Sequence, residues 1–208
     1  TAKLSNQSNR QFLLFFCIQR YYLMHLISKN ELRRLQIKRL TEFANSTQKL
    51  SEDKILKEKL LRNSLLASAE SIGISVSMPL EVSTVPIIAS LWKMGKRVYI
   101  PRCLPKRKME FTLYDKNTIL VKTKFGVLEN RDSKAIVNNN LDLMIVPGLA
   151  YGLDKNSRLG FGGGYYDRFL EKYPTRTLSL VNSVQLFKRT SWQVEEHDIP
   201  IEKLILVK

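Results

Sequence analysis

The chain has 208 residues, 44% of them hydrophobic, and its 34 lysines and arginines against 19 aspartates and glutamates give a net charge of +15. This length and composition predict one domain, or at most two small ones, and exclude collagen, low-complexity disorder and a disulfide-built scaffold. The charge alone fits a solvated basic surface as well as binding to nucleic acid, lipid or small anions. Two distant cysteines, Cys17 and Cys103, favour a reducing, cytoplasmic compartment, and no apolar run approaches the roughly 20 residues that span a bilayer.

Residues 1–27 differ in composition from the rest of the chain. They contain three cations, no acid and one short apolar run at 12–18. This run imitates a signal peptide only weakly, because no small-residue cleavage site follows it. We therefore expect 1–27 to be an appendage, disordered or not native, with the native start near Met24, and 28–208 to form a single domain.

Two helices are predicted first along the chain. Apolar residues at helical spacing, with basic residues on the other faces, predict a helix over 29–44. Ser51 is followed by two acids, which is the pattern of a helix N-cap and first turn. The second helix is therefore predicted over 51–71, with Gly73 as the residue that stops it.

The next segment predicts a strand–helix–strand unit. A short strand is expected over 74–78 and a helix over 82–94, in which Pro86 is tolerated only in the first turn. A second strand over 97–100, closed by Pro101, completes the unit. This alternation is typical of a parallel sheet.

The second half of the chain continues this pattern after a loop-rich stretch over 118–140. The continuous apolar run at 141–146 is typical of a strand buried in the middle of a sheet. Further elements are expected as strands at 109–114, 177–181 and 204–207 and a helix at 165–173. Together these elements predict an α/β fold, a three-layer α/β/α sandwich with helices on both faces of a mostly parallel sheet.

The segment that begins at Arg158 carries the strongest functional signal. Four of the five residues at 160–164 are glycine, and a predicted helix follows, so free N–H groups and the helix dipole favour an anion there. The guanidinium of Arg158 can bind phosphate through two hydrogen bonds, and the carboxylate of Asp167 suits Mg²⁺ beside it. The pattern is neither a Walker A loop nor the dinucleotide fingerprint, whose spacing fails at Tyr165. A tight turn without a ligand remains the alternative, but Arg158 and the tyrosines favour a phosphate site.

This segment resembles the signature of the 5-formyltetrahydrofolate cyclo-ligases, also called methenyltetrahydrofolate synthetases. The family pattern Pro-Gly-Leu-Ala-Phe, then Arg-Leu-Gly-x-Gly-x-Gly-Tyr-Tyr-Asp, is matched here by 147–151 and 158–167. The family's Lys-x-x-x-Arg and Met-x-x-Glu elements are matched by Lys29 with Arg33 and by Met78 with Glu81. Weaker matches lie at 98–102, 109–111, 125–129 and 196–198.

The resemblance implies a fold and a reaction. The fold is the α/β/α sandwich of the NagB/RpiA/CoA-transferase-like kind. The reaction is the ATP- and Mg²⁺-dependent conversion of 5-formyltetrahydrofolate to 5,10-methenyltetrahydrofolate, with release of ADP and phosphate. It runs through a phosphorylated formyl group, an iminium phosphate. The basic charge of the chain would then favour ATP and the anionic tail of the folate, whether that tail carries one glutamate or is polyglutamated.

The resemblance also implies roles for single residues. Catalysis is assigned to Arg158 and Lys29. Binding of ATP is assigned to Lys29, Arg33, Arg158, Leu159, Gly160, Phe161, Gly162, Gly163, Gly164, Tyr165 and Tyr166. Binding of the folate is assigned to Val76, Met78, Glu81 and Tyr165. Binding of Mg²⁺ is assigned to Asp167 and Asp198.

Two other functions stay open from the sequence. A paralogue would keep the nucleotide site and use a different substrate, and Met78 and Glu81 argue against it only weakly. A basic nucleic-acid-binding module would need cations and stacking aromatics gathered on one face, and we expect no nucleic acid because the chain has no RNA-recognition motif or basic tail. Outside the family, Lys29, Arg33 and Glu81 would pass as surface residues, and Val76 as a core residue.

Overall fold

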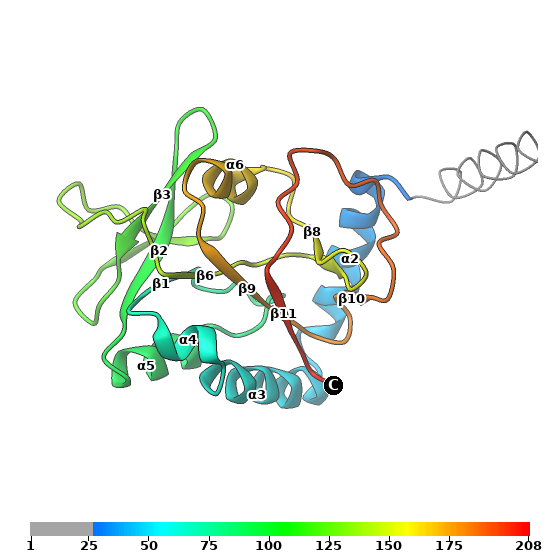
Figure 1. The fold of residues 1–208 in the computed structure, drawn as a ribbon, viewed down its shortest axis with the longest axis horizontal. Coiled ribbons are helices and arrows are strands. Elements are labelled where there is room, and N and C mark those ends of the chain that lie inside the picture. Colours follow the sequence, from blue (N-terminus) through cyan, green and yellow to red (C-terminus); the bar gives the residue numbers. More distant parts are fainter. Residues whose placement is uncertain (1–26) are drawn as a thin grey trace, which may run out of the picture.

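The computed structural model describes residues 27–208, so the appendage expected at 1–27 and the start near Met24 lie almost wholly outside the described residues (Figure 1). Six strands form the central sheet in the order β11-β9-β6-β1-β2-β3. Neighbouring strands are parallel except β2 and β3, which are antiparallel. These strands are β1 (Ser71–Ile74), β2 (Arg97–Leu104), β3 (Lys108–Leu113), β6 (Leu143–Ile145), β9 (Arg176–Val181) and β11 (Lys203–Leu206).

Helices cover both faces of this sheet, which confirms the predicted three-layer α/β/α sandwich (Figure 1). One face carries α3 (Thr47–Leu61), α4 (Ser64–Ser68) and α5 (Val85–Lys93). The opposite face carries α6 (Tyr165–Lys172). No helix within 27–208 is both long enough and apolar enough to cross a membrane.

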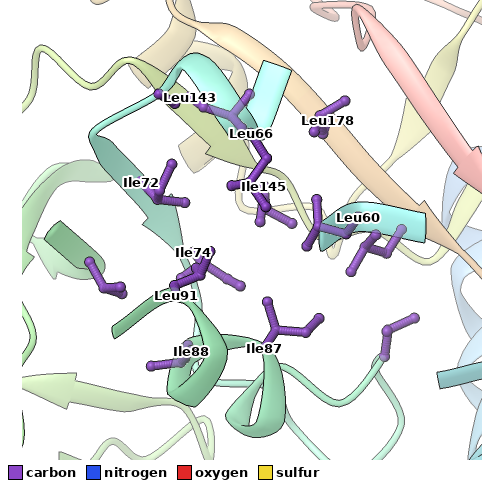
Figure 2. Close-up of a cluster of buried hydrophobic side chains, with 14 of the residues drawn as sticks. Leu60, Leu66, Ile72, Ile74, Ile87, Ile88, Leu91, Leu143, Ile145 and Leu178 are labelled. Atoms are coloured by element: carbon purple, nitrogen blue, oxygen red, sulfur yellow. The ribbon is translucent and has the colours of Figure 1, made fainter. Parts of the chain in front are cut away.

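The larger hydrophobic core lies between the sheet and α3, α4 and α5 (Figure 2). Leu60, Leu66 and Ile87 come from these three helices and are fully buried. They belong to one cluster with Ile72 of β1 and Ile145 of β6. Because helices cover both faces, the central strands are apolar on both sides, which is why they appear in the sequence as continuous hydrophobic runs.

A smaller, three-stranded sheet in the order β10-β7-β8 lies beside α2 (Lys29–Phe43). Its strands are β7 (Ala150–Gly152), β8 (Ser157–Leu159) and β10 (Leu186–Phe187). A separate hairpin pairs β4 (Leu120–Lys122) with β5 (Leu128–Asn130). The sequence predicts none of these five strands, because two or three residues are too few to show a period of two.

The predicted start of the second helix is wrong by five residues. Ser46 is the N-cap of α3, and its hydroxyl accepts a hydrogen bond from the backbone N–H of Lys49 at 3.1 Å, whereas Ser51 lies inside the helix. The helix also ends at Leu61, and Asn63 caps the separate helix α4. A local capping pattern cannot choose between two serines when both are followed by polar residues.

The first strand is also earlier than predicted. It begins at Ser71, so Gly73 does not stop a helix but lies within β1. A Cβ there would come within 2.6 Å of the Leu141 side chain and 3.0 Å of Phe111, so glycine allows close packing across the sheet. Val76, placed in a strand over 74–78, makes only an isolated bridge to Leu128.

The rest of the βαβ unit is confirmed except at the start of its helix and at one proline. The helix α5 (Val85–Lys93) begins three residues later than predicted, and this start places Pro86 in the first turn, where a proline is tolerated. Pro101 does not end the strand, because β2 continues to Leu104. Its pairing with β1 stops at Tyr99, so the missing N–H of Pro101 removes no hydrogen bond from that ladder. The later helix and strands lie within two residues of the predicted ranges.

Asp142 joins the starts of two central strands and provides a test of the fold. Its Oδ2 accepts hydrogen bonds from the N–H of Glu70 at 3.0 Å and from the N–H and hydroxyl of Ser71, both at 2.8 Å. These bonds hold the pKa of Asp142 below its ordinary value, so their contribution to stability is present at neutral pH and is lost as pH falls through the lowered pKa. We expect Asp142→Asn to lower the free energy of unfolding by about 1 kcal/mol at pH 7 and by less at acid pH, measured by urea denaturation. An equal loss at both pH values would contradict this account.

Candidate active site

A pocket of about 30 Å³ lies at the carboxyl ends of β1 and β6. Parallel α/β sheets bind ligands at this edge, outside the ends of their strands. Its walls come from the turns after the strands and from the loop before α5, and they comprise Ser75, Ser77, Glu81, Val82, Thr84, Ile145, Val146, Pro147, Gly148, Tyr151, Leu180 and Gln185. Of the predicted site residues, only Glu81 lines this pocket.

The glycine segment lies between β8 and α6, as a turn that leads into the helix. Gly164 is the N-cap of α6 and has a φ of 63°, and Gly162 has a φ of 99°. Both angles are in the left-handed region that favours glycine. A Cβ on Gly162 would also come within 3.3 Å of the Arg33 guanidinium. The segment therefore depends on glycine for its backbone and for the approach of a cation.

Two arginines hold the carbonyl groups of this segment. Arg33, from α2, donates from Nε to the carbonyl oxygen of Gly160 at 2.9 Å. Arg168, in the first turns of α6, donates to the carbonyl oxygen of Gly163 and, at 3.4 Å, to that of Arg107. Arg168 was not among the predicted site residues, although its place four residues after Gly164 puts it one helical turn after the segment.

Lys29 and Asp198 form an ion pair between α2 and the segment before β11. Lys29 Nζ lies 2.7 Å from Asp198 Oδ2 and 3.5 Å from Glu195 Oε2. Burial raises the pKa of Asp198, but hydrogen bonds from the Glu195 N–H and from Lys29 together lower it by more. The pKa of Asp198 therefore lies below its ordinary value. Asp198 is therefore ionised at neutral pH.

Arg158 and Asp167 form a second ion pair, which was not predicted. Arg158 Nη2 lies 2.9 Å from each carboxylate oxygen of Asp167, and Nη1 donates to the carbonyl oxygen of Pro147 at 3.3 Å. The Arg158 side chain is only 4% exposed, and its guanidinium lies 5.7 Å from the centre of the Tyr166 ring. Within 27–208, its buried Nε has no hydrogen-bond partner. The sequence predicts Arg158 as a phosphate ligand and Asp167 as a Mg²⁺ ligand, whereas in the structure the two side chains bind each other.

Of the two predicted Mg²⁺ ligands, Asp167 contacts the residue that follows Asp198. Asp167 Oδ1 accepts a hydrogen bond at 3.3 Å from the N–H of Ile199, the residue after Asp198. Ligand atoms of Glu195, His197 and Asp198 lie within 4.8 Å of one another. Carboxylate oxygens are the ligands that Mg²⁺ prefers, so the side chains of Asp167 and Asp198 fit the ion. In this structure, Lys29 and Arg158 pair with the same carboxylates.

Glu81 is a buried acid on the loop between β1 and α5. Its Oε2 accepts a hydrogen bond from the N–H of Met78 at 2.7 Å. Burial raises the pKa of Glu81, and the Met78 N–H lowers it by less. Burial also raises the pKa of Tyr151, to about 12, and that of Tyr166, with the charge of Glu81 adding to both. One acid and two phenols thus lie close to the carboxyl ends of the strands.

The remaining predicted residues differ in how far their side chains can reach a ligand. Leu159 is 1% exposed and packs with Leu32 and Trp192, so only its backbone is available. Val76 is 5% exposed and belongs to the larger core. Phe161 is 43% exposed, and Tyr165 packs against Gly163 and the smaller core.

Comparisons with known proteins identify one family. The sequence model of the 5-formyltetrahydrofolate cyclo-ligase family matches residues 26–207. The probable 5-formyltetrahydrofolate cyclo-ligase of Schizosaccharomyces pombe is 36% identical over 124 residues, which are 57% of this chain and 60% of that protein. The Escherichia coli 5-formyltetrahydrofolate cyclo-ligase is 32% identical over 144 residues, 66% of this chain and 78% of that protein. The Mus musculus enzyme of the same name is 26% identical over 186 residues, 83% and 90% of the two chains.

Two solved structures share the fold. The 5,10-methenyltetrahydrofolate synthetase of Aquifex aeolicus superposes with a TM-score of 0.71 at 24% identity, over 86% of this chain and 90% of that one. The corresponding synthetase of Mycoplasma pneumoniae gives 0.65 at 20% identity, over 86% and 98% of the chains. The family match spans all of the described residues except Lys208, and so includes both ion pairs, Lys29 with Asp198 and Arg158 with Asp167. The chain belongs to the 5-formyltetrahydrofolate cyclo-ligase family.

Proposed function

We propose that this chain closes 5-formyltetrahydrofolate to 5,10-methenyltetrahydrofolate, using ATP and releasing ADP and phosphate. The observation that carries this proposal is that Arg33 and Arg158 contact the glycine segment at Gly160. Lys29 lies one turn of α2 before Arg33 and pairs with Asp198, and the nearby sheet edge holds the buried acid Glu81. Family membership supports the overall reaction. The assignment of residues, the single unit 28–208 and the cytoplasmic location belong to the proposal.

The glycine segment and its cations bind the triphosphate of ATP in this proposal. The backbone N–H groups before α6 and the positive end of its dipole face an anion, while Arg33 and Arg168 hold the carbonyls of the segment. Lys29 and Arg158 supply further positive charge. Transfer of a phosphoryl group depends mainly on positioning and on neutralising charge, so such an arrangement needs no protein nucleophile.

The folate ring binds toward Glu81 and Met78. A carboxylate can accept hydrogen bonds from the amino-pyrimidine edge of a pterin. The pocket of about 30 Å³ is much smaller than the several hundred Å³ typical of ligand sites, so binding must widen it. The side chain of Met78, which is half-buried, and the ring of Tyr165 lie at partly exposed positions suited to such a change. Val76 is a core residue and would contribute through its backbone.

Mg²⁺ would be held by Asp167 and Asp198, and when bound it would neutralise charge on the phosphates. The protein's own part is to hold both carboxylates by hydrogen bonds. Lys29 and the N–H of Glu195 hold Asp198, and Arg158 and the N–H of Ile199 hold Asp167.

The chemistry then follows in two displacements. The formyl oxygen bonds to the γ-phosphorus of ATP while the bond to ADP breaks. The secondary amine nitrogen at position 10 of the folate next adds to the formyl carbon and loses its proton. The bond between that carbon and the phosphorylated oxygen breaks, and inorganic phosphate leaves. Phosphorylation converts a poor leaving group, the formamide oxygen, into a good one, and the cations neutralise the charge that develops.

The deciding experiment mixes the protein with (6S)-5-formyltetrahydrofolate, ATP and Mg²⁺ and follows the near-ultraviolet absorbance of the methenyl product. One ADP and one phosphate should appear for each product molecule. Binding of Mg²⁺·ATP without turnover would favour the paralogue that uses another substrate. Salt-sensitive RNA binding tighter than ATP binding would favour the nucleic-acid-binding alternative.

Gly162→Ala should raise the KM for ATP about tenfold, because a side chain at this positive φ is strained and pushes on the Arg33 guanidinium. The matched control is Gly95→Ala. Gly95 has a φ of 74° with nothing within 4 Å of its Cβ, and it follows α5 outside the site. Steady-state kinetics should show an unchanged KM for this control, and equal effects of both variants would contradict the role of the segment.

A further inference from the structure

Gln36 is a fully buried polar residue in the middle of α2. The other buried residues of this helix are apolar. Its side-chain Nε2 donates to the carbonyl oxygen of Leu149 at 2.9 Å and to that of Val184 at 3.1 Å. Its Oε1 accepts a hydrogen bond from Arg39 at 3.3 Å. An apolar side chain would satisfy the burial pattern of the helix, so the amide has a different purpose.

The two carbonyl groups belong to loops at the carboxyl edge of the main sheet. Leu149 lies in the loop after β6, four residues after the end of the strand and two after Pro147, whose carbonyl accepts a hydrogen bond from Arg158. Val184 lies in the loop after β9. Gln185, also buried, donates to the carbonyl of Gly148 at 2.6 Å and so fixes the first loop to the second. Gln36 therefore joins α2 to both loops beside the site.

The position of Gln36 along the helix connects it to the predicted ATP ligands. Lys29 and Arg33 precede it by seven and three residues, about two turns and about one turn, so the three residues lie on one side of α2. Lys29 reaches Asp198 and Arg33 reaches Gly160 from this side. The contacts of Gln36 thus set the rotation and depth of the helix that carries both cations.

We propose that Gln36 is a positioning residue for ATP, acting through Lys29 and Arg33 without touching the nucleotide. This inference rests on the proposed function, because it assumes that these cations bind phosphate. Without the amide, the carbonyl of Leu149 loses a buried hydrogen bond and that of Val184 a partly buried one, and α2 must shift to let water replace them. A shift of about 1 Å is enough to weaken a site that depends on positioning.

Gln36→Met tests this proposal, because methionine has nearly the same length and donates no hydrogen bond. We expect the KM for ATP to rise about tenfold, while kcat and the KM for the folate change by less than about twofold. The matched control is Leu40→Val, on the same buried side of α2, which lowers the melting temperature without removing a hydrogen bond. A lower melting temperature for Gln36→Met with an unchanged KM for ATP would show a purely structural role and overturn the proposal.

A double-mutant cycle with Arg33→Ala shows whether the effect passes through the cation. In that background Gln36→Met should raise the KM for ATP by clearly less than about tenfold. Full additivity would overturn the proposal. Should Gln36→Met not fold, Gln36→Asn is too short to reach either carbonyl and keeps a polar side chain, and the same ATP-specific loss is expected for it.

Calorimetric titration of Mg²⁺·ATP in the absence of folate separates this inference from the proposed function. If the wild-type protein binds Mg²⁺·ATP but turns over no 5-formyltetrahydrofolate, the proposed function fails, and weaker binding to Gln36→Met still supports the positioning role. If Gln36→Met binds Mg²⁺·ATP as tightly as wild type, the positioning role fails even when turnover of the folate is confirmed.

Discussion

Replacing Arg158 with alanine should lower kcat by about 10³-fold while the protein stays folded. The guanidinium is almost fully buried, lies against the Tyr166 ring, and is held by Asp167 and Pro147 at the start of the glycine segment. A positive charge that is already fixed in place stabilises the negative charge on the transferring phosphoryl group more than one that must first move into position. The loss is measured by the absorbance assay, and circular dichroism checks the fold.

The matched control is Arg176→Ala. Arg176 also pairs with a carboxylate, that of Glu202, but it is exposed and lies at the amino end of β9, the opposite edge of the sheet. Its removal should leave kcat within about twofold of wild type, because exposed ion pairs contribute little. A near-normal rate for Arg158→Ala would reject its role at the phosphate, and Arg158→Lys would show how much of the effect needs the planar guanidinium.

Glu81→Gln should raise the KM for the folate about 30-fold and change that for ATP little, since losing a charged hydrogen-bond partner costs about 2 kcal/mol. Gln keeps an oxygen for the N–H of Met78, so the loop should keep its shape. Steady-state kinetics with each substrate varied in turn provides the measurement. Glu70→Gln, an exposed acid paired with Arg97 just before β1, is the control and should have no effect.

The same variant has a predicted effect on the pH dependence of stability. Because burial raises the pKa of Glu81, the wild-type protein loses stability as pH rises through that raised value. Glutamine cannot ionise. The free energy of unfolding of Glu81→Gln, relative to wild type, should therefore increase in urea titrations as the pH rises above 4.5, the ordinary pKa of the carboxyl group. If this difference is constant with pH, the Glu81 carboxyl is not buried away from water in solution, and its assignment to the folate loses its physical basis.

The site is a chain of alternating charges that crosses three parts of the structure. Lys29 of α2 pairs with Asp198, and the next residue donates its N–H to Asp167. Asp167 of α6 in turn pairs with Arg158 of β8. Each charge is partly buried and compensated, so the array is stable without a ligand. Mg²⁺·ATP would have to share these partners, which ties binding of the nucleotide to the carboxylates.

Local patterns in the sequence determined the layers of the fold and the centre of the site. Buried strands appear as apolar runs because helices cover both faces, and Pro86 fits only a first helical turn, so the α/β/α sandwich could be predicted. Four glycines before a helix point to an anion site because they leave the backbone N–H groups open to a ligand, and two of them, Gly162 and Gly164, adopt the positive φ that glycine tolerates best. The family signature added Lys29, Glu81 and Asp198, which are ordinary residues in their local context.

Only the tertiary structure decided which residues meet. Arg158 and Asp167, nine residues apart, form an ion pair, and Lys29 meets Asp198 across 169 residues. The roles of Gln36, buried among leucines, and of Gly73, inside a strand, also depend on neighbours far away in the chain. The physical reason is that periodicity and capping act within one or two turns, whereas ion pairs, buried amides and close packing depend on contacts that exist only after the sheet has formed.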